Sequence, residues 1–198
     1  MRRSPFSKRL DNPRTEMEKI ETGFKGLYVI KPTVYSDKRG YFFESFNQET
    51  YSNAGIPFSP VQDNESRSAK GVIRGLHYQL RPHDQAKLIR VIEGRIYDLA
   101  LDLRKDSPTY GKWFGLELDS DSKTQLFIPK GFAHGFSVLS DIAIILYKTD
   151  NIYDKASERG IALDDPDLNI DWRTGNTKPV ISEKDTKNPP LKEADNNF

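Results

Sequence analysis

Apolar and polar residues alternate along most of this chain with the period of two that is typical of β-strands. Turn-forming residues interrupt the pattern about every 8–12 residues, and the helical period is almost absent. One or two helical turns are expected only at 48–54, just before Gly55. Strands are predicted at 24–30, 41–46, 61–66, 112–118, 125–128, 132–138, 142–149 and 160–163, and in two apolar runs that meet at Glu93-Gly94.

The stretch from Lys70 to Arg104 organises the chain, because it combines β-forming sequence with an imidazole, a guanidinium and an ammonium group. Its last strand has one apolar face and one face that mixes apolar and acidic residues. The apolar face contains Tyr97, Leu99, Leu101 and Leu103, and the mixed face contains Ile96, Asp98, Ala100 and Asp102. Such a strand suits an inter-sheet core on one side and a cavity or solvent on the other. The predicted fold is therefore an all-β sandwich or barrel.

The composition narrows the class of protein. The chain has 198 residues, enough for one domain with its own core, and is 36% hydrophobic, 11% aromatic and 30% charged. The formal net charge of +1 favours neither nucleic acid nor a membrane as partner. Cysteine is absent, which excludes disulfides and thiolate chemistry. Recognition of an anion would have to come from local cations.

Residues 1–20 are polar, and we expect a flexible N-terminal extension there, followed by a single domain at 21–198 that ends in a C-terminal tail. This basic N-terminal segment lacks the apolar core of a secretory signal. No apolar stretch reaches the roughly 18 residues of a membrane span. A cytoplasmic location is the expectation.

The histidines do not predict a metal site. There are three, at His77, His83 and His134. A metal-binding β-barrel usually places two histidines two residues apart on one strand, with a carboxylate nearby. Here a proline-containing loop separates His77 from His83, although Glu93 or Asp98 could complete a site on paper. No metal is expected, and His83 is interpreted as a solvated loop residue.

Other side chains near the central stretch suit acid–base chemistry, although each also has a structural explanation. A lone histidine such as His77 is more often structural than catalytic, a strand-end lysine such as Lys87 is usually solvated, and Tyr147 could belong to the core. Arg74 is more unusual, because an arginine between apolar residues needs an anionic partner and its planar group suits phosphate. His134 is followed by Gly135, which allows a close approach of the backbone.

Together these residue types fit the removal of a proton next to a carbonyl group. An imidazole can act as the base near neutral pH, and a cation can stabilise the enolate oxygen. A tyrosine hydroxyl can return a proton from the opposite face, and a carboxylate can hold the imidazole tautomer.

Several longer blocks resemble the dTDP-4-dehydrorhamnose 3,5-epimerase family of nucleotide-sugar epimerases. The resemblance covers residues 22–190, and the matching blocks are 37–46, 62–64, 70–79, 87–91, 106–109, 128–136, 146–149 and 182–185. It implies a double-stranded β-helix jelly roll, a cupin-like barrel with few short helices. It also implies a dTDP-sugar substrate, no cofactor, a place in dTDP-rhamnose and surface-polysaccharide biosynthesis, and a homodimer that exchanges strands.

The resemblance assigns roles to particular residues. His77 resembles the general base, Asp185 its carboxylate partner, Lys87 the enolate stabiliser and Tyr147 the acid. The implied substrate and diphosphate contacts are Arg74, His134 and Lys184, and further nucleotide-sugar contacts are Arg39, Glu44, Gln62, Asn64 and Glu158. Of these, Arg39 and Glu44 are expected to act across the subunits of the dimer.

Two departures from the family pattern bear on these assignments. The run from Trp172 to Asp185 is one residue longer than usual, with Arg173 where proline is common, so a neighbour of Asp185 is the alternative partner of His77. The N-terminal extension has no counterpart. The alternative functions are a 3- or 5-epimerase that acts at one carbon, a non-catalytic module that binds sugar nucleotides, and a metal-dependent cupin.

Overall fold

The structure is a computed structural model that describes residues 17–198. Most of the predicted N-terminal extension lies outside the described residues. The strands are β1 (Met17–Glu21), β2 (Tyr28–Pro32), β3 (Tyr35–Asp37), β4 (Gly40–Phe42), β5 (Gln62–Ala69), β6 (Ile73–Gln79), β7 (Lys87–Glu93), β8 (Arg95–Asp102), β9 (Trp113–Asp119), β10 (Gln125–Ile128), β11 (Phe132–Val138), β12 (Ile142–Thr149) and β13 (Glu158–Gly160). The helices are α1 (Gln48–Asn53) and two 3-10 turns, η1 (Asp185–Lys187) and η2 (Leu191–Glu193).

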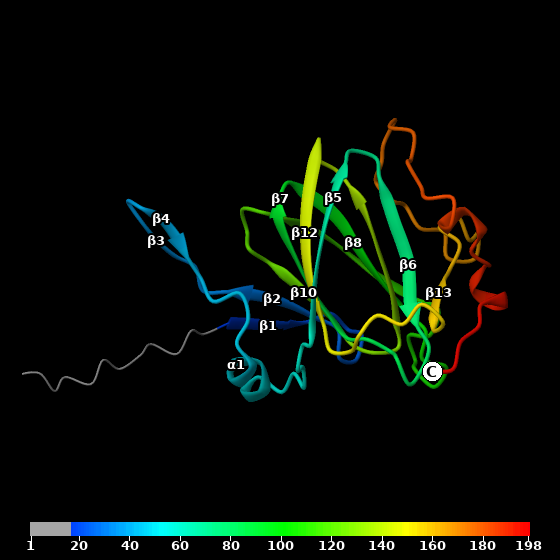
Figure 1. Cartoon of the computed structure of the whole chain (residues 1–198), viewed down its shortest axis with the longest axis horizontal. Helices are drawn as coiled ribbons and strands as arrows, with labels where there is room; N and C mark the ends of the chain where they lie inside the picture. The colour runs from blue at the N-terminus through cyan, green and yellow to red at the C-terminus, as the bar shows by residue number, and fades with distance from the viewer. Residues whose placement is uncertain (1–16) are drawn as a thin grey trace, which may run out of the picture.

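Two antiparallel sheets pack face to face and form the body of the molecule (Figure 1). The six-stranded sheet has the order β1-β2-β10-β7-β12-β5, and the five-stranded sheet has the order β13-β6-β11-β8-β9. Strands β3 and β4 form a separate hairpin, here called the arm, which projects away from the body (Figure 1). The predicted all-β jelly roll with few short helices is confirmed.

Most of the predicted elements are present, but three predictions at the N-terminal end are wrong. Strand β1 pairs with β2 and begins at Met17, inside the segment expected to be flexible. Residues 24–27 form a turn before β2 instead of its first half. The aromatic run 41–46 is not one strand, because only its first two residues belong to β4. The remainder leads into α1, whose first turn is capped by Asn47 through hydrogen bonds from two backbone amides.

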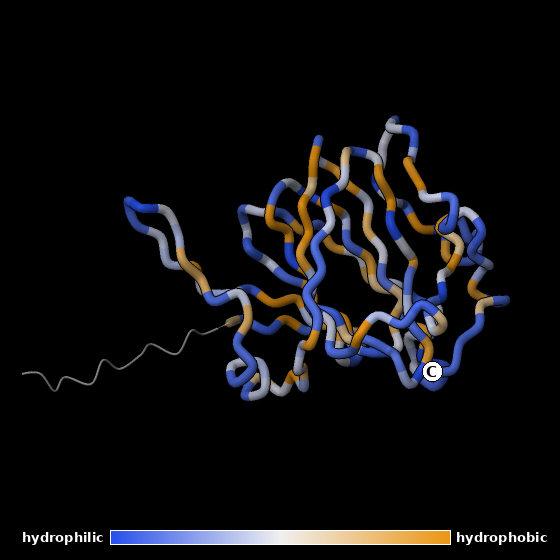
Figure 2. The backbone as a smooth tube through the Cα atoms, in the orientation of Figure 1, coloured by the Kyte–Doolittle hydropathy of each residue, from blue (hydrophilic) through white to orange (hydrophobic). Residues whose placement is uncertain are grey.

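Three apolar clusters hold the layers together. The first lies between the sheets and includes Ile89 and Ala100. The second covers the outer face of the five-stranded sheet with the C-terminal segment, and the third packs α1 against the outer face of the six-stranded sheet. Figure 2 shows hydrophobic residues along the strands of the body and hydrophilic residues at the tip of the arm. No helix within residues 17–198 is long and apolar enough to cross a membrane.

The two faces of β8 are as predicted, and different parts of the molecule bury them. The apolar face, with Leu99 and Leu101, points outward and is covered by the C-terminal segment, including Trp172. The mixed face points inward, where Ala100 joins the inter-sheet core. As a result Asp98 is fully buried inside the barrel.

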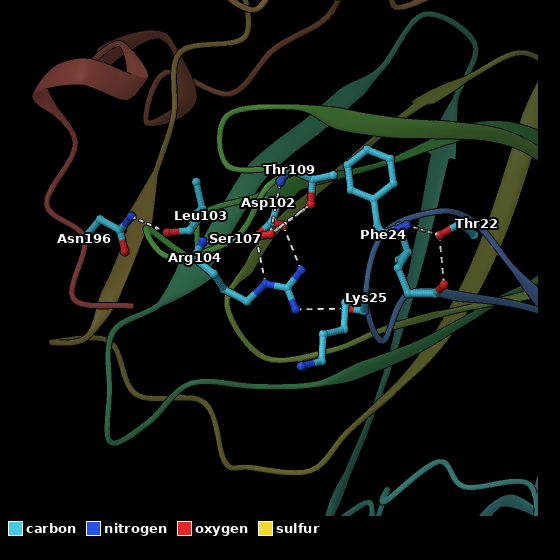
Figure 3. A network of polar contacts seen from close by, with 10 residues as sticks. Thr22, Phe24, Lys25, Asp102, Leu103, Arg104, Ser107, Thr109 and Asn196 are labelled. Atoms are coloured by element: carbon cyan, nitrogen blue, oxygen red, sulfur yellow. Dashed lines mark hydrogen bonds and ion pairs between the residues drawn. The ribbon is translucent and has the colours of Figure 1, made fainter.

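Asp102, at the end of β8, has a structural role (Figure 3). The Arg104 guanidinium donates to its two carboxylate oxygens at 2.8 and 2.7 Å, and the hydroxyls of Ser107 and Thr109 each donate at 2.6 Å. Burial would raise the pKa of Asp102, but these hydrogen bonds lower it. Arg104 also donates to the carbonyl oxygen of Lys25 at 2.8 Å. The ionised carboxylate therefore ties the loop after β8 to the segment before β2.

Strands β6 and β11 approach each other closely at two glycines. A Cβ atom added to Gly75 would lie 2.4 Å from the Cα atom of Gly135, and Gly75 has a φ of +130°. His134 pairs with His77, and Phe136 pairs with Arg74. The two paired positions are two residues apart on β11 but three residues apart on β6, so β6 has one extra residue between them. The resulting β-bulge turns both Arg74 and His77 toward the inside of the barrel.

Replacing Gly75 by alanine is expected to lower the free energy of unfolding by about 2–3 kcal/mol, because the added methyl group overlaps the backbone of the neighbouring strand. Gly23→Ala is the control: Gly23 also has a positive φ, +86°, but no atom lies within 4 Å of the added Cβ. Its expected cost is about 1 kcal/mol. Urea unfolding followed by tryptophan fluorescence measures both, and equal losses would contradict the close approach.

Candidate active site

The inner faces of the two sheets enclose a cavity of about 460 Å³ at one end of the barrel. A second hollow of about 130 Å³ adjoins it, and His77, Lys87 and Tyr147 line both. The larger cavity contains seven of the predicted site residues: Arg74, His77, Lys87, His134, Tyr147, Lys184 and Asp185. The smaller hollow adds Gln62, Asn64 and Glu158. Ten of the twelve predicted residues therefore meet in one place.

His77 and Asp185 form a hydrogen-bonded pair although 108 residues separate them. The Nε2 atom of His77 lies 2.6 Å from the Oδ1 atom of Asp185, and the carboxylate is almost completely buried. Burial would raise the pKa of Asp185, but the hydrogen bond and the electrostatic interaction with His77, with smaller effects of Ser182 and Lys184, lower it. The carboxylate is thus ionised at neutral pH and can orient the imidazole. The neighbouring Glu183 pairs with Lys187 instead.

Backbone hydrogen bonds on both sides of η1 bring Asp185 to the cavity. Before η1, the amide of Val180 donates to the carbonyl of Gly71, and Val180 accepts from Ile73. After η1, the carbonyl of Pro189 accepts from Ala162. The extra residue predicted in this run does not displace Asp185. Arg173 adopts a positive φ of 55° within the longer segment.

Lys87 begins β7 in the sheet opposite His77. Burial lowers the pKa of its ammonium group to about 8, although the negative charges of Asp98 and Glu158 counteract the shift. The group is therefore mostly protonated at neutral pH, yet it is poorly solvated. A cation of this kind interacts strongly with negative charge that develops in the cavity.

Tyr147 lies on β12, also in the sheet opposite His77. Burial raises the pKa of its hydroxyl above the ordinary value, and the charge of Glu158 adds to this effect while that of Arg74 opposes it. The hydroxyl is therefore protonated at neutral pH and can donate a proton. A base on one sheet and a proton donor on the other face the same cavity.

Polar side chains surround these groups. The Arg74 Nε atom donates to the Ser68 hydroxyl at 3.0 Å. The Oε2 atom of Glu158 accepts from Tyr153 at 2.7 Å and lies 2.5 Å from the Lys184 ammonium group. The side-chain amide of Gln62 donates to that of Asn64 at 2.8 Å. The polar groups around the cavity are therefore two cations, the Glu158 carboxylate that pairs with one of them, and several neutral hydrogen-bonding groups.

Two predicted site residues lie away from this cavity. Arg39 is at the tip of the arm, where it pairs with Asp37 at 2.5 Å. Glu44 lies beside α1, and its carboxylate accepts from Asn47 at 3.0 Å and Thr50 at 3.3 Å. Within one chain, neither residue contributes to the cavity.

One buried group at the site was not predicted to belong to it. The Oδ1 atom of Asp98 lies 2.7 Å from the Nε2 atom of His134, within hydrogen-bond distance, and both side chains are buried. The sequence did contain a signal, because an aspartate in the middle of an apolar strand requires a buried partner. Among the described residues, no group of three His, Asp or Glu side chains is arranged to hold a metal ion.

The fold and the cavity define a class: a cupin-like jelly-roll enzyme in which a histidine–carboxylate pair, a poorly solvated lysine and a tyrosine share one site. The model of the dTDP-4-dehydrorhamnose 3,5-epimerase family matches residues 21–193. The enzyme of that name from Shigella flexneri is 49% identical over 180 residues, which cover 90% of this chain and 98% of that protein. This chain belongs to the dTDP-4-dehydrorhamnose 3,5-epimerase family.

Two further relatives indicate the range of the family. The crystal structure of dTDP-6-deoxy-D-glucose-3,5-epimerase from Legionella pneumophila Philadelphia 1, in complex with dTDP-4-keto-L-rhamnose, is 45% identical, with a TM-score of 0.87 over 91% of this chain and 95% of that chain. A dTDP-4-dehydrorhamnose 3-epimerase from Streptomyces niveus is 38% identical over 82% of this chain and 78% of that protein.

The substitution Asp98→Asn is expected to move the pKa of Lys87 below its value of about 8, because the carboxylate charge helps to retain the proton. An NMR titration of the lysine side chains measures this, with Lys87→Arg to assign the signal. Glu117→Gln is the control, because Glu117 pairs with Arg173 outside the cavity. An unchanged Lys87 titration in the Asp98 variant would contradict the coupling.

Proposed function

We propose that this protein catalyses epimerisation at both carbons that flank the 4-keto group of dTDP-4-dehydro-6-deoxy-D-glucose, yielding dTDP-4-dehydro-L-rhamnose. The observation that carries the proposal is the placement of His77 on one sheet and of Tyr147 and Lys87 on the other, around one cavity. A sugar ring held between the sheets would have a base on one face and a proton donor on the other. The reaction needs no redox cofactor, because proton transfer alone inverts each carbon.

His77 is proposed to remove the proton next to the keto group. The ionised Asp185 orients the imidazole and stabilises the imidazolium that forms. The electrons of the broken C–H bond move into the enolate, whose oxygen gains negative charge. Lys87 is proposed to face this oxygen, where its poorly solvated ammonium group stabilises the enolate more than the neutral ketone.

Tyr147 is proposed to return a proton to the carbon from the opposite face, which inverts the configuration. Its raised pKa keeps the hydroxyl protonated and ready to donate. The keto group acidifies both neighbouring carbons. The same base and acid can therefore serve twice if the ring turns over between the two steps, and if His77 first releases its proton to solvent and Tyr147 regains one from solvent.

The nucleotide part of the substrate is proposed to lie at the entrance of the cavity. Arg74 and Lys184 provide positive charge for the diphosphate. Gln62, Asn64 and Glu158 offer hydrogen bonds in the adjoining hollow. The ligand named in the Legionella pneumophila structure, dTDP-4-keto-L-rhamnose, agrees with this class of substrate.

The arm is proposed to reach the site of a second copy in a homodimer. It projects from the body and exposes Tyr41 and Phe42, which are 59% and 68% accessible. Large apolar side chains on a projecting hairpin favour burial against a partner. In this arrangement Arg39 and Glu44 would complete the partner's site, which accounts for their distance from the cavity of their own chain. The cytoplasm, where activated sugars are made, is the proposed location.

Deuterium incorporation tests the reaction directly. With substrate in deuterated water, the enzyme should introduce deuterium at two sugar carbons, as counted by mass spectrometry and NMR. Deuterium at one carbon would support a single-site epimerase, the activity named for the Streptomyces niveus relative. No incorporation would leave only a binding module. His77→Ala should slow exchange by about 100–10,000-fold and Lys87→Ala by about 100–1,000-fold. Near-normal rates in both folded variants would refute the assignment.

A mixed dimer tests the role of the arm. Arg39→Ala and His77→Ala are each expected to inactivate the homodimer. A dimer with one subunit of each kind, purified through two different tags, should recover about half of the wild-type rate, because one site then has both residues intact. An inactive mixed dimer, or an active Arg39→Ala homodimer, would show that the arm does not serve the partner.

A further inference from the structure

Lys87 is placed at the end of the pairing between three strands. It is the first residue of β7, and it pairs with Ile128, the last residue of β10, and with Thr149, the last residue of β12. The regular ladder of backbone hydrogen bonds stops here on both sides. Chain segments at such ends open more easily than the middle of a sheet. A side chain that must be placed accurately at this position therefore needs additional support.

Asp150, the residue after β12, continues the pairing by one step. Its backbone amide donates to the carbonyl oxygen of Ala86 at 3.3 Å, and its Oδ1 atom accepts from the backbone amide of Ala86 at 2.7 Å. In a regular antiparallel pair, a backbone carbonyl would accept the second of these hydrogen bonds. The side-chain oxygen takes its place, so both backbone polar groups of the residue directly before Lys87 are held.

The other oxygen of the same carboxylate reaches the neighbouring strand. The Oδ2 atom of Asp150 lies 3.5 Å from the ammonium group of Lys130, in the turn after β10, and the Asp150 side chain is only 15% exposed. Burial raises the pKa of Asp150, whereas the hydrogen bond from Ala86 and the charge of Lys130 oppose the shift. One carboxylate thus joins the ends of β10 and β12 to the start of β7.

The influence of Asp150 on Lys87 is positional. Burial lowers the pKa of Lys87, and the negative charges that oppose this shift belong to Asp98 and Glu158, not to Asp150. Asp150 contacts Ala86, whose side chain packs in the apolar cluster on the outer face of the sheet. Lys87 is the next residue, so its side chain points to the opposite face and lines the cavity.

We propose that Asp150 is a positioning residue, which holds the start of β7 so that the Lys87 ammonium group stays where the enolate oxygen forms. The proposal rests on the proposed function, and it adds a residue outside the cavity to the proposed machinery. A cation stabilises developing charge best when its place is fixed before the reaction. A misplacement of about 1 Å can cost about 100-fold in rate.

An NMR titration of Lys87 in the ligand-free protein tests the positioning. Asp150→Ala removes the acceptor for the Ala86 amide, so the start of β7 should loosen and admit water. The pKa of Lys87 should then rise from about 8 toward its ordinary value of 10.5. Asp150→Asn keeps an oxygen that can accept from Ala86, and it should leave the pKa near 8. Asp150→Glu, which displaces the carboxylate by one methylene group, is the second variant if the alanine variant does not fold.

Asp63→Ala is the matched control, because Asp63 pairs with Lys148 in the same sheet but on an exposed surface. It should not change the Lys87 titration. An unchanged pKa of Lys87 in a folded Asp150→Ala or Asp150→Glu variant would overturn the proposal. Equal shifts in the alanine and asparagine variants would also overturn it, because the hydrogen bond to Ala86 would then not be what holds Lys87.

Turnover provides a second test through a double-mutant cycle. Asp150→Ala should lower kcat about 10–100-fold and leave KM within about twofold, since the enolate charge exists only during the reaction. In the Lys87→Ala background the same substitution should have almost no further effect, because the group through which it acts is gone. An equal loss of kcat in both backgrounds would show that Asp150 does not act through Lys87.

The titration requires no turnover, so its outcome stands apart from the proposed reaction. A failure of that reaction would appear as a wild-type enzyme that incorporates no deuterium. A failure of the positioning proposal would appear as an active wild-type enzyme whose Lys87 titrates in the same way with and without the Asp150 carboxylate.

Discussion

The close approach of β6 and β11 is the constraint on which the site depends. Because neither Gly75 nor Gly135 carries a side chain, the two backbones can meet, and β6 accommodates one extra residue between the paired positions. Without this bulge, the period of two would place Arg74 and His77 on opposite faces of β6, since they are three residues apart. With it, both face the cavity, and His77 is opposite His134. A feature of the backbone therefore decides which side chains can act together.

The polar interior is tolerated because its ionisable groups are arranged to compensate one another. An isolated buried charge would be very unfavourable, but here two carboxylates face two imidazoles, and Lys87 is close enough to be influenced by Asp98 and Glu158. Apolar residues of the inter-sheet cluster, such as Ile145, supply the stability. The cavity can thus hold a poorly solvated cation, which a water-filled site would not do, and its low solvation also raises the pKa of the Tyr147 hydroxyl.

The sequence was sufficient to predict the strands with regular alternation, the all-β class and most of the residues that meet in the cavity. The prediction failed where the chain departs from the regular alternation of apolar and polar residues. The aromatic run 41–46 looked like a strand, but it forms the end of the arm and the approach to α1. The sequence predicted an inter-sheet core on one face of β8 without specifying which, and the C-terminal segment covers the apolar face from outside. Alternation reveals that a strand has two faces, but it cannot specify which neighbour buries each one. For the same reason Asp98 was not assigned to the site.

The C-terminal segment links the stability of the barrel to the assembly of the site. It covers the outer face of the five-stranded sheet through Trp172 and Leu163, and it also delivers Asp185 to the inner cavity. The hydrogen bonds of Val180 with Gly71 and Ile73 join these two tasks, because they attach the segment to the edge of β6 just ahead of Arg74. A carboxylate that is remote in sequence can be positioned accurately only if its own segment is rigid. Packing on the outside of the sheet supplies that rigidity, so the groups that would perform chemistry inside the barrel depend on apolar contacts outside it.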